Sequence, residues 1–165
     1  MRLRVAAAAL NQTPLDWDGN RQRCLAAIDE ARAQGAHVLC LPELGITGYG
    51  CEDAFQAPGV LDTAWEMLES MLPHTLGLVV SFGLPVMCRH ALYNCAALVV
   101  DGKLVGLVAK RALAGDGLHY EPRWFKPWPK GVSRELPVAD GAVPIGDLLF
   151  DVGGVQIGFE ICEDA

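Results

Sequence analysis

The chain has 165 residues, of which 52% are hydrophobic and 20% are charged, with a formal net charge of −7 at pH 7. This length fits one domain with a buried core, and the sequence lacks the unbroken run of about 18 apolar residues that a membrane span needs. The negative charge and the lack of basic clusters argue against nucleic acid or an anionic membrane as a partner, so we expect a small-molecule ligand.

The first part of the chain predicts a strand, a helix and a second strand. Residues 2–10 are apolar almost throughout, which is typical of a strand covered on both faces of a sheet. Asp18 is the predicted N-cap of a helix over residues 19–34, which Gly35 would end. Residues 38–41 predict a second buried strand. This order favours a parallel pair joined by a right-handed crossover.

The middle of the chain predicts further strands of a mixed sheet. A glycine-rich stretch over residues 45–50 predicts a loop, followed by a helix over 60–72 and a strand over 76–84. Residues 92–100 and 104–109 predict a β-hairpin whose tight turn is formed by Asp101 and Gly102.

The last part of the chain has a long irregular segment and then a second predicted hairpin. Residues 110–143 show little periodicity, and a loop of this length in a compact domain is usually functional. The second hairpin is predicted over 147–152 and 155–162. The sequence stops three residues after Cys162, where a covering helix is expected, so the fold is expected to be cut short.

Six cysteines occur without C-x-x-C pairs or metal-type spacing. This usage predicts no metal site and no disulfide framework. It is typical of a reducing cytoplasm, in which most thiols serve as small core residues. The cysteines are Cys24, Cys40, Cys51, Cys88, Cys95 and Cys162.

Three residues suited to catalysis stand at predicted strand ends. Cys162 follows an apolar strand, and the turn after such a nucleophile can present backbone N–H groups to an oxyanion. Glu43 ends a parallel strand, where ligands bind in open α/β sheets. Lys110 ends the strand over 104–109, where a cation could hold a thiolate. Taken singly, each residue also has a simpler interpretation: a packed thiol for the cysteine and solvated charges for the other two.

Other possible sites have less support from the sequence. His119 could form a Cys-His pair, but no carboxamide or carboxylate partner is implied by its spacing, and it could equally order the loop. The glycines at 45, 48 and 50 lack the order of a dinucleotide-binding motif, and no phosphate-binding P-loop occurs. Trp124, Phe125 and Trp128 could wall a substrate pocket or pack the loop onto the body of the domain.

Several segments resemble a known family. Leu41 to Leu44, Lys110, and Gly158 to Asp164 are similar to the three signature segments of the nitrilase (carbon-nitrogen hydrolase) superfamily. Residues 47–55, 93–96 and 113–125 resemble, more narrowly, the amidase domain of glutamine-dependent NAD synthetases. The likeness covers nearly the whole chain. The superfamily commonly has glutamine after the lysine, whereas this chain has Arg111, a departure that could alter the local charge.

The resemblance implies a mechanism and the residues that carry it. Cys162 would attack the side-chain amide of glutamine, ammonia would leave, and a thioester would remain for hydrolysis. Glu43 would be the general base, and Lys110 would stabilise the oxyanion and help to position the substrate. Glu121 would orient Lys110 or contact the substrate, although a loop salt bridge would explain it as well. The resemblance also implies three further substrate-binding residues, Tyr49, Tyr120 and Glu163.

The resemblance further implies an α/β fold of the α-β-β-α sandwich type, with the second half missing from residues 1–165. The ammonia would pass to a synthetase domain of the same parent chain, and ATP and Mg²⁺ are expected for that absent domain, with no cofactor in this chain. We expect a cytoplasmic homo-oligomer. Two alternatives are a stand-alone nitrilase-like amidohydrolase acting on another small amide, and an inactive fragment that serves subunit contacts through exposed edges.

Overall fold

The computed structural model describes residues 2–117, 119–139 and 141–165. Within these residues the fold is mixed α/β, with a seven-stranded sheet in the order β1-β2-β3-β4-β5-β7-β6. The strands are β1 (Val5–Ala7), β2 (Val38–Cys40), β3 (Val79–Cys88), β4 (Ala91–Val100), β5 (Lys103–Ala109), β6 (Ser133–Val138) and β7 (Gly141–Gly146). Strands β1, β2 and β3 are parallel, β3, β4 and β5 are antiparallel, and β7 joins β5 in parallel. The predicted mixed sheet is thus confirmed.

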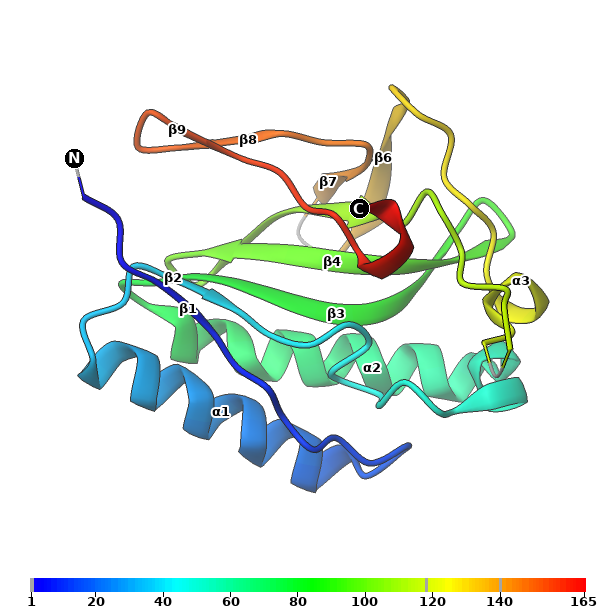
Figure 1. Cartoon of the computed structure of the whole chain (residues 1–165), viewed down its shortest axis with the longest axis horizontal. Coiled ribbons are helices and arrows are strands. Elements are labelled where there is room, and N and C mark those ends of the chain that lie inside the picture. The colour runs from blue at the N-terminus through cyan, green and yellow to red at the C-terminus, as the bar shows by residue number, and fades with distance from the viewer. Residues whose placement is uncertain (1, 118, 140) are drawn as a thin grey trace.

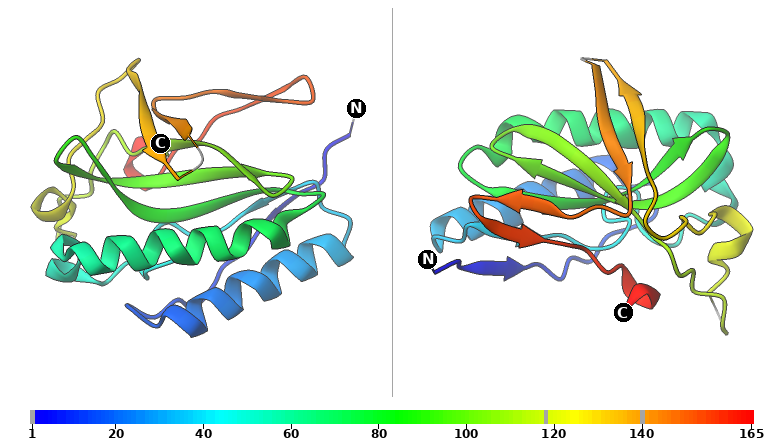
Figure 2. Two further views of the ribbon diagram at one scale, coloured as in Figure 1. Left: turned by 180° about the vertical axis from the view of Figure 1, so that it is seen from behind. Right: turned by 90° about the horizontal axis from the view of Figure 1, so that it is seen from above.

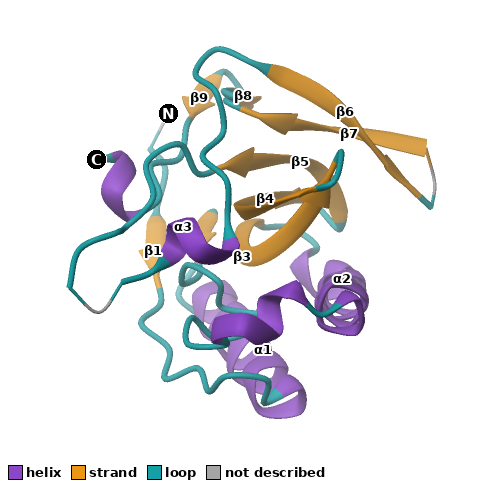
Figure 3. Cartoon of the chain, turned by 90° about the vertical axis from the view of Figure 1, so that its right-hand side faces the viewer, coloured by secondary structure: helices purple, strands orange, loops and turns teal. Residues whose placement is uncertain are grey.

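The two long helices cover one face of this sheet. Helices α1 (Trp17–Ala33) and α2 (Pro58–Met71) lie beside each other below the strands in Figure 1, and the small hairpin of β8 (Phe150–Val152) and β9 (Val155–Ile157) lies on the other side. Figure 2 shows the same layering from behind and from above. A short helix, α3 (Glu121–Trp124), lies at one end of the sheet, which faces the viewer in Figure 3.

The main core fills the space between the helices and the sheet. Its fully buried members include Ile28 of α1, Leu68 of α2, and Val80 and Phe82 of β3. Burying each large apolar side chain stabilises the fold by about 1.5–3 kcal/mol. This packing supports the sheet from one side, and two of the catalytic candidates, Glu43 and Lys110, follow the ends of β2 and β5.

Some predicted element boundaries were wrong for local reasons. The N-cap of α1 is Asp16, not Asp18, because the Asp16 side chain accepts a hydrogen bond from the Gly19 amide at 3.2 Å. Asp18 lies in the first turn, where its negative charge favours the helix dipole. The predicted buried strand over 2–10 is only three residues long, and Val5 is 70% exposed.

The predicted irregular segment over 110–143 contains regular structure. It holds α3, all of β6 and the start of β7, and β6 is mostly exposed. Because β6 has little apolar alternation and carries Pro137, its sequence lacked a strand signal. The second predicted hairpin is confirmed, but β9 ends at Ile157, so Cys162 follows four irregular residues rather than a strand end.

The thiols are mostly buried, as predicted, and all six are free. Cys40 is an exception, because it is exposed although it lies within an apolar stretch. In the described part of the chain, no helix combines the length and apolar character needed to cross a membrane.

Candidate active site

Glu43 lies on a tight turn that follows β2. The Gly45 amide donates to the Pro42 carbonyl at 3.0 Å, and the Ile46 amide donates to the Gly83 carbonyl of β3, also at 3.0 Å. Gly83 permits this contact because a Cβ there would lie 2.3 Å from the Leu44 nitrogen and 2.5 Å from the Pro42 oxygen. The turn is therefore seated directly on β3, which fixes the backbone of Glu43.

Lys110 follows β5 and is completely buried between two carboxylates. Its Nζ lies 2.8 Å from Oε1 of Glu43 and 2.8 Å from both carboxylate oxygens of Glu121. The Lys110 side chain is 0% exposed, that of Glu121 is 1% exposed, and that of Glu43 is 21% exposed. Glu121 also accepts hydrogen bonds from the Ala114 amide at 2.7 Å and from the Tyr49 hydroxyl at 3.1 Å. Of the two roles predicted for Glu121, these contacts favour orienting Lys110.

The two buried partners keep each other charged. Burial by itself would lower the pKa of Lys110, but hydrogen bonds to Glu121 and Glu43 outweigh burial and raise it. Burial would raise the pKa of Glu121, but the hydrogen bond from Lys110 and the Ala114 amide lower it. At neutral pH this pair is therefore a cation beside a carboxylate.

Asn94, on β4, is a member of this cluster that the sequence did not single out. Its Nδ2 donates to Oε1 of Glu43 at 2.7 Å and lies 3.4 Å from Oε1 of Glu121. The Lys110 amide donates to the Asn94 carbonyl at 2.9 Å, which ties the end of β5 to β4. The only signal in the sequence was its place in the segment over 93–96 that resembles NAD synthetases.

Cys162 begins a single turn of 3-10 helix, η3 (Cys162–Asp164), and has a positive φ of 53°. A non-glycine residue in this region is uncommon, and such strain often occurs at functional sites. Burial of the neighbouring Ile161 anchors the turn, while Cys162 itself is exposed.

Asp164 fastens the turn that carries Cys162 to the segment after Lys110, and sequence reasoning missed this role. Its Oδ1 accepts hydrogen bonds from the amides of Arg111 at 2.9 Å and Ala112 at 2.7 Å, and its Oδ2 accepts one from the Ile161 amide at 3.2 Å. One carboxylate therefore sets the position of Cys162 relative to Lys110.

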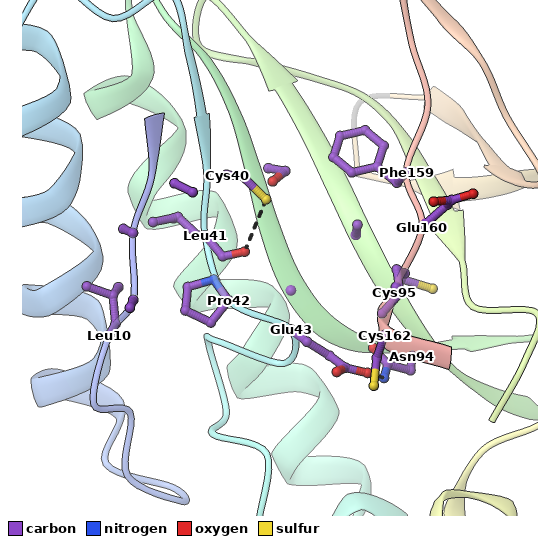
Figure 4. Close-up of a pocket in the computed structure, with 17 residues that line it drawn as sticks. Leu10, Cys40, Leu41, Pro42, Glu43, Asn94, Cys95, Phe159, Glu160 and Cys162 are labelled. Atoms are coloured by element: carbon purple, nitrogen blue, oxygen red, sulfur yellow. Dashed lines mark hydrogen bonds between the residues drawn. The ribbon is translucent and has the colours of Figure 1, made fainter. Parts of the chain in front are cut away.

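Cys162 and Glu43 line the same pocket, which has a volume of about 450 Å³. In Figure 4, Glu43, Asn94 and Cys162 lie together at one end of the pocket, and Cys40 and Phe159 lie at the other. Glu121 and Lys110 are not among the residues that line this pocket, although Lys110 contacts Oε1 of Glu43. The structure thus brings together a carboxylate and a thiol at a pocket surface, with a buried cation beneath them.

The remaining predicted substrate-binding residues lie at different places. Tyr49 contacts Glu121, and its hydroxyl lies 3.3 Å from Nδ1 of His119. Burial and the charge of Glu121 raise the pKa of the Tyr49 hydroxyl, so the hydroxyl stays protonated. Tyr120 is 60% exposed and lines a separate pocket that it shares with Tyr49. Glu163 is exposed on η3.

The other candidates from the sequence fill structural positions. His119 contacts Tyr49 rather than Cys162 among the described residues. Phe125 is 1% exposed and Trp128 is 5% exposed, and Trp128 packs against the Tyr93 ring at 4.6 Å between centroids. These two aromatic residues pack the long segment onto the body of the domain. No group of three or more His, Cys, Asp or Glu side chains in the described ranges is placed to hold a metal ion.

The arrangement matches a known family. The family model described as carbon-nitrogen hydrolase matches residues 4–165. The chain belongs to this family. Among curated relatives, the glutamine-dependent NAD(+) synthetase of Saccharomyces cerevisiae is 39% identical over 171 residues, which cover 97% of this chain and 24% of that protein. The Homo sapiens protein of the same name is 36% identical over 174 residues, with 99% and 25% covered. The chain thus spans about a quarter of the length of these relatives.

Solved structures agree with this membership. A glutamine-dependent NAD(+) synthetase from Cytophaga hutchinsonii has a TM-score of 0.96 and 45% sequence identity, over 99% of this chain and 28% of that chain. An amidase from Nesterenkonia sp. AN1 has a TM-score of 0.72 at 21% identity, over 94% of this chain and 54% of that chain, and this likeness concerns the fold alone. The predicted nitrilase-type α/β fold is confirmed.

Proposed function

We propose that this carbon-nitrogen hydrolase domain releases ammonia from the side-chain amide of glutamine, with Cys162 as the nucleophile. The observation that carries the proposal is the shared pocket of Cys162 and Glu43, with Glu43 held by the buried Lys110. The likeness to glutamine-dependent NAD(+) synthetases over nearly the whole chain supports glutamine as the substrate.

Glu43 acts as the general base in this proposal. It takes the proton from the Cys162 thiol as Sγ bonds to the amide carbon, and a positioned base of this kind contributes about 10²- to 10⁴-fold to the rate. Glu43 then gives the proton to the leaving nitrogen, the C–N bond breaks, and ammonia departs. A water deprotonated by Glu43 hydrolyses the thioester, which releases glutamate and restores the thiol.

Lys110 supplies positive charge below the reacting centre. Its raised pKa keeps it protonated, so its field favours the negative charge that develops on the substrate oxygen. Glu121 holds the lysine in place. Glutamine contact by Tyr49, Tyr120 and Glu163 remains a prediction.

We further propose that the ammonia serves a synthetase domain of a longer parent protein that makes NAD from deamido-NAD. The size of the relatives supports this proposal, because this chain spans about a quarter of their length. The ATP and Mg²⁺ requirement of that domain, a cytoplasmic location and a homo-oligomeric state remain predictions.

The test is ammonia release from glutamine by the full-length protein, compared with Cys162→Ala. Cys40→Ala is the matched control, because Cys40 is an exposed thiol that lines the same pocket. We expect Cys162→Ala to abolish release and Cys40→Ala to retain it. Release by Cys162→Ala at the parent rate would refute the nucleophile. Activity on other small amides but not on glutamine would instead favour a stand-alone amidohydrolase.

A further inference from the structure

Asn94 makes an unusual set of contacts for a buried amide. The residue is 1% exposed, and its Nδ2 faces oxygens of both Glu43 and Glu121. Its Oδ1 is buried and has no hydrogen-bond partner among the described residues. The chain also offers a contrast in Asn20, whose buried side chain accepts from the Thr13 amide and donates to two backbone carbonyls.

The orientation of the Asn94 amide follows from its surroundings. If the amide were turned over, its carbonyl oxygen would face two carboxylate oxygens, which are acceptors only when ionised. The observed orientation leaves one buried oxygen unpaired, an arrangement that folded proteins rarely tolerate. A residue kept only for packing would not need this unpaired atom. The contacts therefore indicate a role for the nitrogen at the carboxylates.

This nitrogen acts on one particular oxygen of Glu43. Oε1 receives hydrogen bonds from both Asn94 and Lys110, at 2.7 and 2.8 Å. Among the described residues, no hydrogen bond reaches Oε2. Because Oε1 is engaged by two donors, Oε2 is the carboxylate oxygen that Glu43 has left to accept a proton at the pocket that it lines.

We propose that Asn94 is a positioning residue that turns Oε1 of Glu43 inward, so that Oε2 receives the proton of Cys162. This inference rests on the proposed function, because it assigns a role toward the base and the nucleophile of that reaction. It predicts that loss of the Asn94 donor affects proton transfer more than substrate binding.

The experiment uses two variants of the full-length protein. Asn94→Ala removes the donor, and Asn94→Asp keeps the shape but places a third carboxylate against Glu43. Both changes remove a hydrogen-bond donor from Oε1 of Glu43, and Asn94→Asp also adds a negative charge, so the acid side of the measured pH profile of kcat/KM should move to higher pH, and further for Asn94→Asp. We expect kcat to fall by about 10-fold or more while KM changes by less than about threefold.

A second readout follows the thiol without glutamine. The alkylation rate of Cys162 by iodoacetamide, measured against pH, should show the same shift to higher pH in both variants. Thr75→Val is the structural control, because Thr75 is 0% exposed, donates to the Leu72 carbonyl and accepts from the Gly102 amide at the far end of the β4–β5 hairpin. It should lower the melting temperature without moving either pH profile.

The outcomes separate the two proposals. Only Asn94 variants that keep a cooperative thermal transition are assayed. Wild-type pH profiles in these variants would overturn the positioning role of Asn94. In that case an inactive Cys162→Ala would still support Cys162 as the nucleophile. If Cys162→Ala retains turnover, the proposed function fails and the inference about Asn94 fails with it. A shift in Thr75→Val equal to that in the Asn94 variants would also refute the inference.

Discussion

Gly83→Ala should displace Glu43, the proposed general base, without altering any polar side chain of the site. An added Cβ would lie 2.3 Å from the Leu44 nitrogen, 2.5 Å from the Pro42 oxygen and 2.9 Å from the Glu43 carbonyl carbon. All three atoms belong to the backbone turn that carries Glu43, so no flexible side chain can move aside. To reach even 3.0 Å, the turn must move away from β3 by about 0.7 Å.

The size of this displacement sets the expected effect. A shift of about 1 Å at a catalytic group can lower the rate by about 100-fold, so we expect a loss of kcat of that order in glutamine hydrolysis. Overpacking of this kind also destabilises a fold by about 1–3 kcal/mol, which urea denaturation of the same protein would measure.

Gly59→Ala is the matched control for Gly83→Ala. Gly59 lies in the first turn of α2, and a Cβ there would meet no atom within 4 Å. We expect unchanged activity and a free energy of unfolding that stays the same or rises by about 0.4–1 kcal/mol. If Gly83→Ala retained wild-type kcat in a folded protein, the packing of the Glu43 turn against β3 would not control the position of Glu43.

Further predictions concern the buried ion pair and the turn that carries Cys162. Lys110→Met leaves the buried Glu121 without its cation and should lower the free energy of unfolding, measured by urea denaturation, by about 3–5 kcal/mol. A loss below about 1 kcal/mol would contradict the claim that Lys110 and Glu121 form a buried ion pair. Because the pKa of Glu121 is lowered from 4.5, the stability that Glu121 gives the fold is present above that pH and is lost on acidification. Because the pKa of Lys110 is raised from 10.5, the stability that Lys110 gives the fold is present below that pH and is lost in alkali. Urea midpoints measured against pH should therefore fall on both sides of a plateau, and an alkaline decline as large in Lys110→Met would refute this assignment. Asp164→Asn weakens the link between the Cys162 turn and the segment after Lys110 and should reduce kcat by about 10-fold or more. Asp151→Asn is the control, because it alters a similar contact to the Gly154 amide in the exposed β8–β9 hairpin and should leave kcat unchanged. Equal activities of the two variants would count against the link.

The elements with strong local signals could be predicted from the sequence. The hairpin of β4 and β5 is marked by two apolar runs around Asp101 and Gly102, and its structure agrees with the prediction. The β6 strand is mostly exposed and contains Pro137, so it lacks the alternation by which strands are recognised. The N-cap of α1 could not be assigned from the sequence, because Asp16 and Asp18 both suit this position and only the backbone conformation decides between them.

The site was predictable only in part, because its members are joined by long-range contacts. Glu43, Lys110 and Cys162 were proposed from predicted strand ends and from the resemblance of their segments to the family, although Cys162 does not directly follow a strand. Asn94 meets Glu43 across 51 residues of sequence, and Asp164 meets Ala112 across 52. Their polar side chains have no local pattern that indicates such partners, so the register of β4 with β5 and the path of η3 had to be known first.

The most direct measurement is the detection of the covalent intermediate. Full-length protein would be mixed with glutamine, quenched with acid during turnover, digested and analysed by mass spectrometry. We expect a γ-glutamyl thioester on the peptide that contains Cys162 and its absence in Cys162→Ala, with Cys40 unmodified. Continued ammonia release by Cys162→Ala, or a γ-glutamyl adduct confined to another residue, would contradict it.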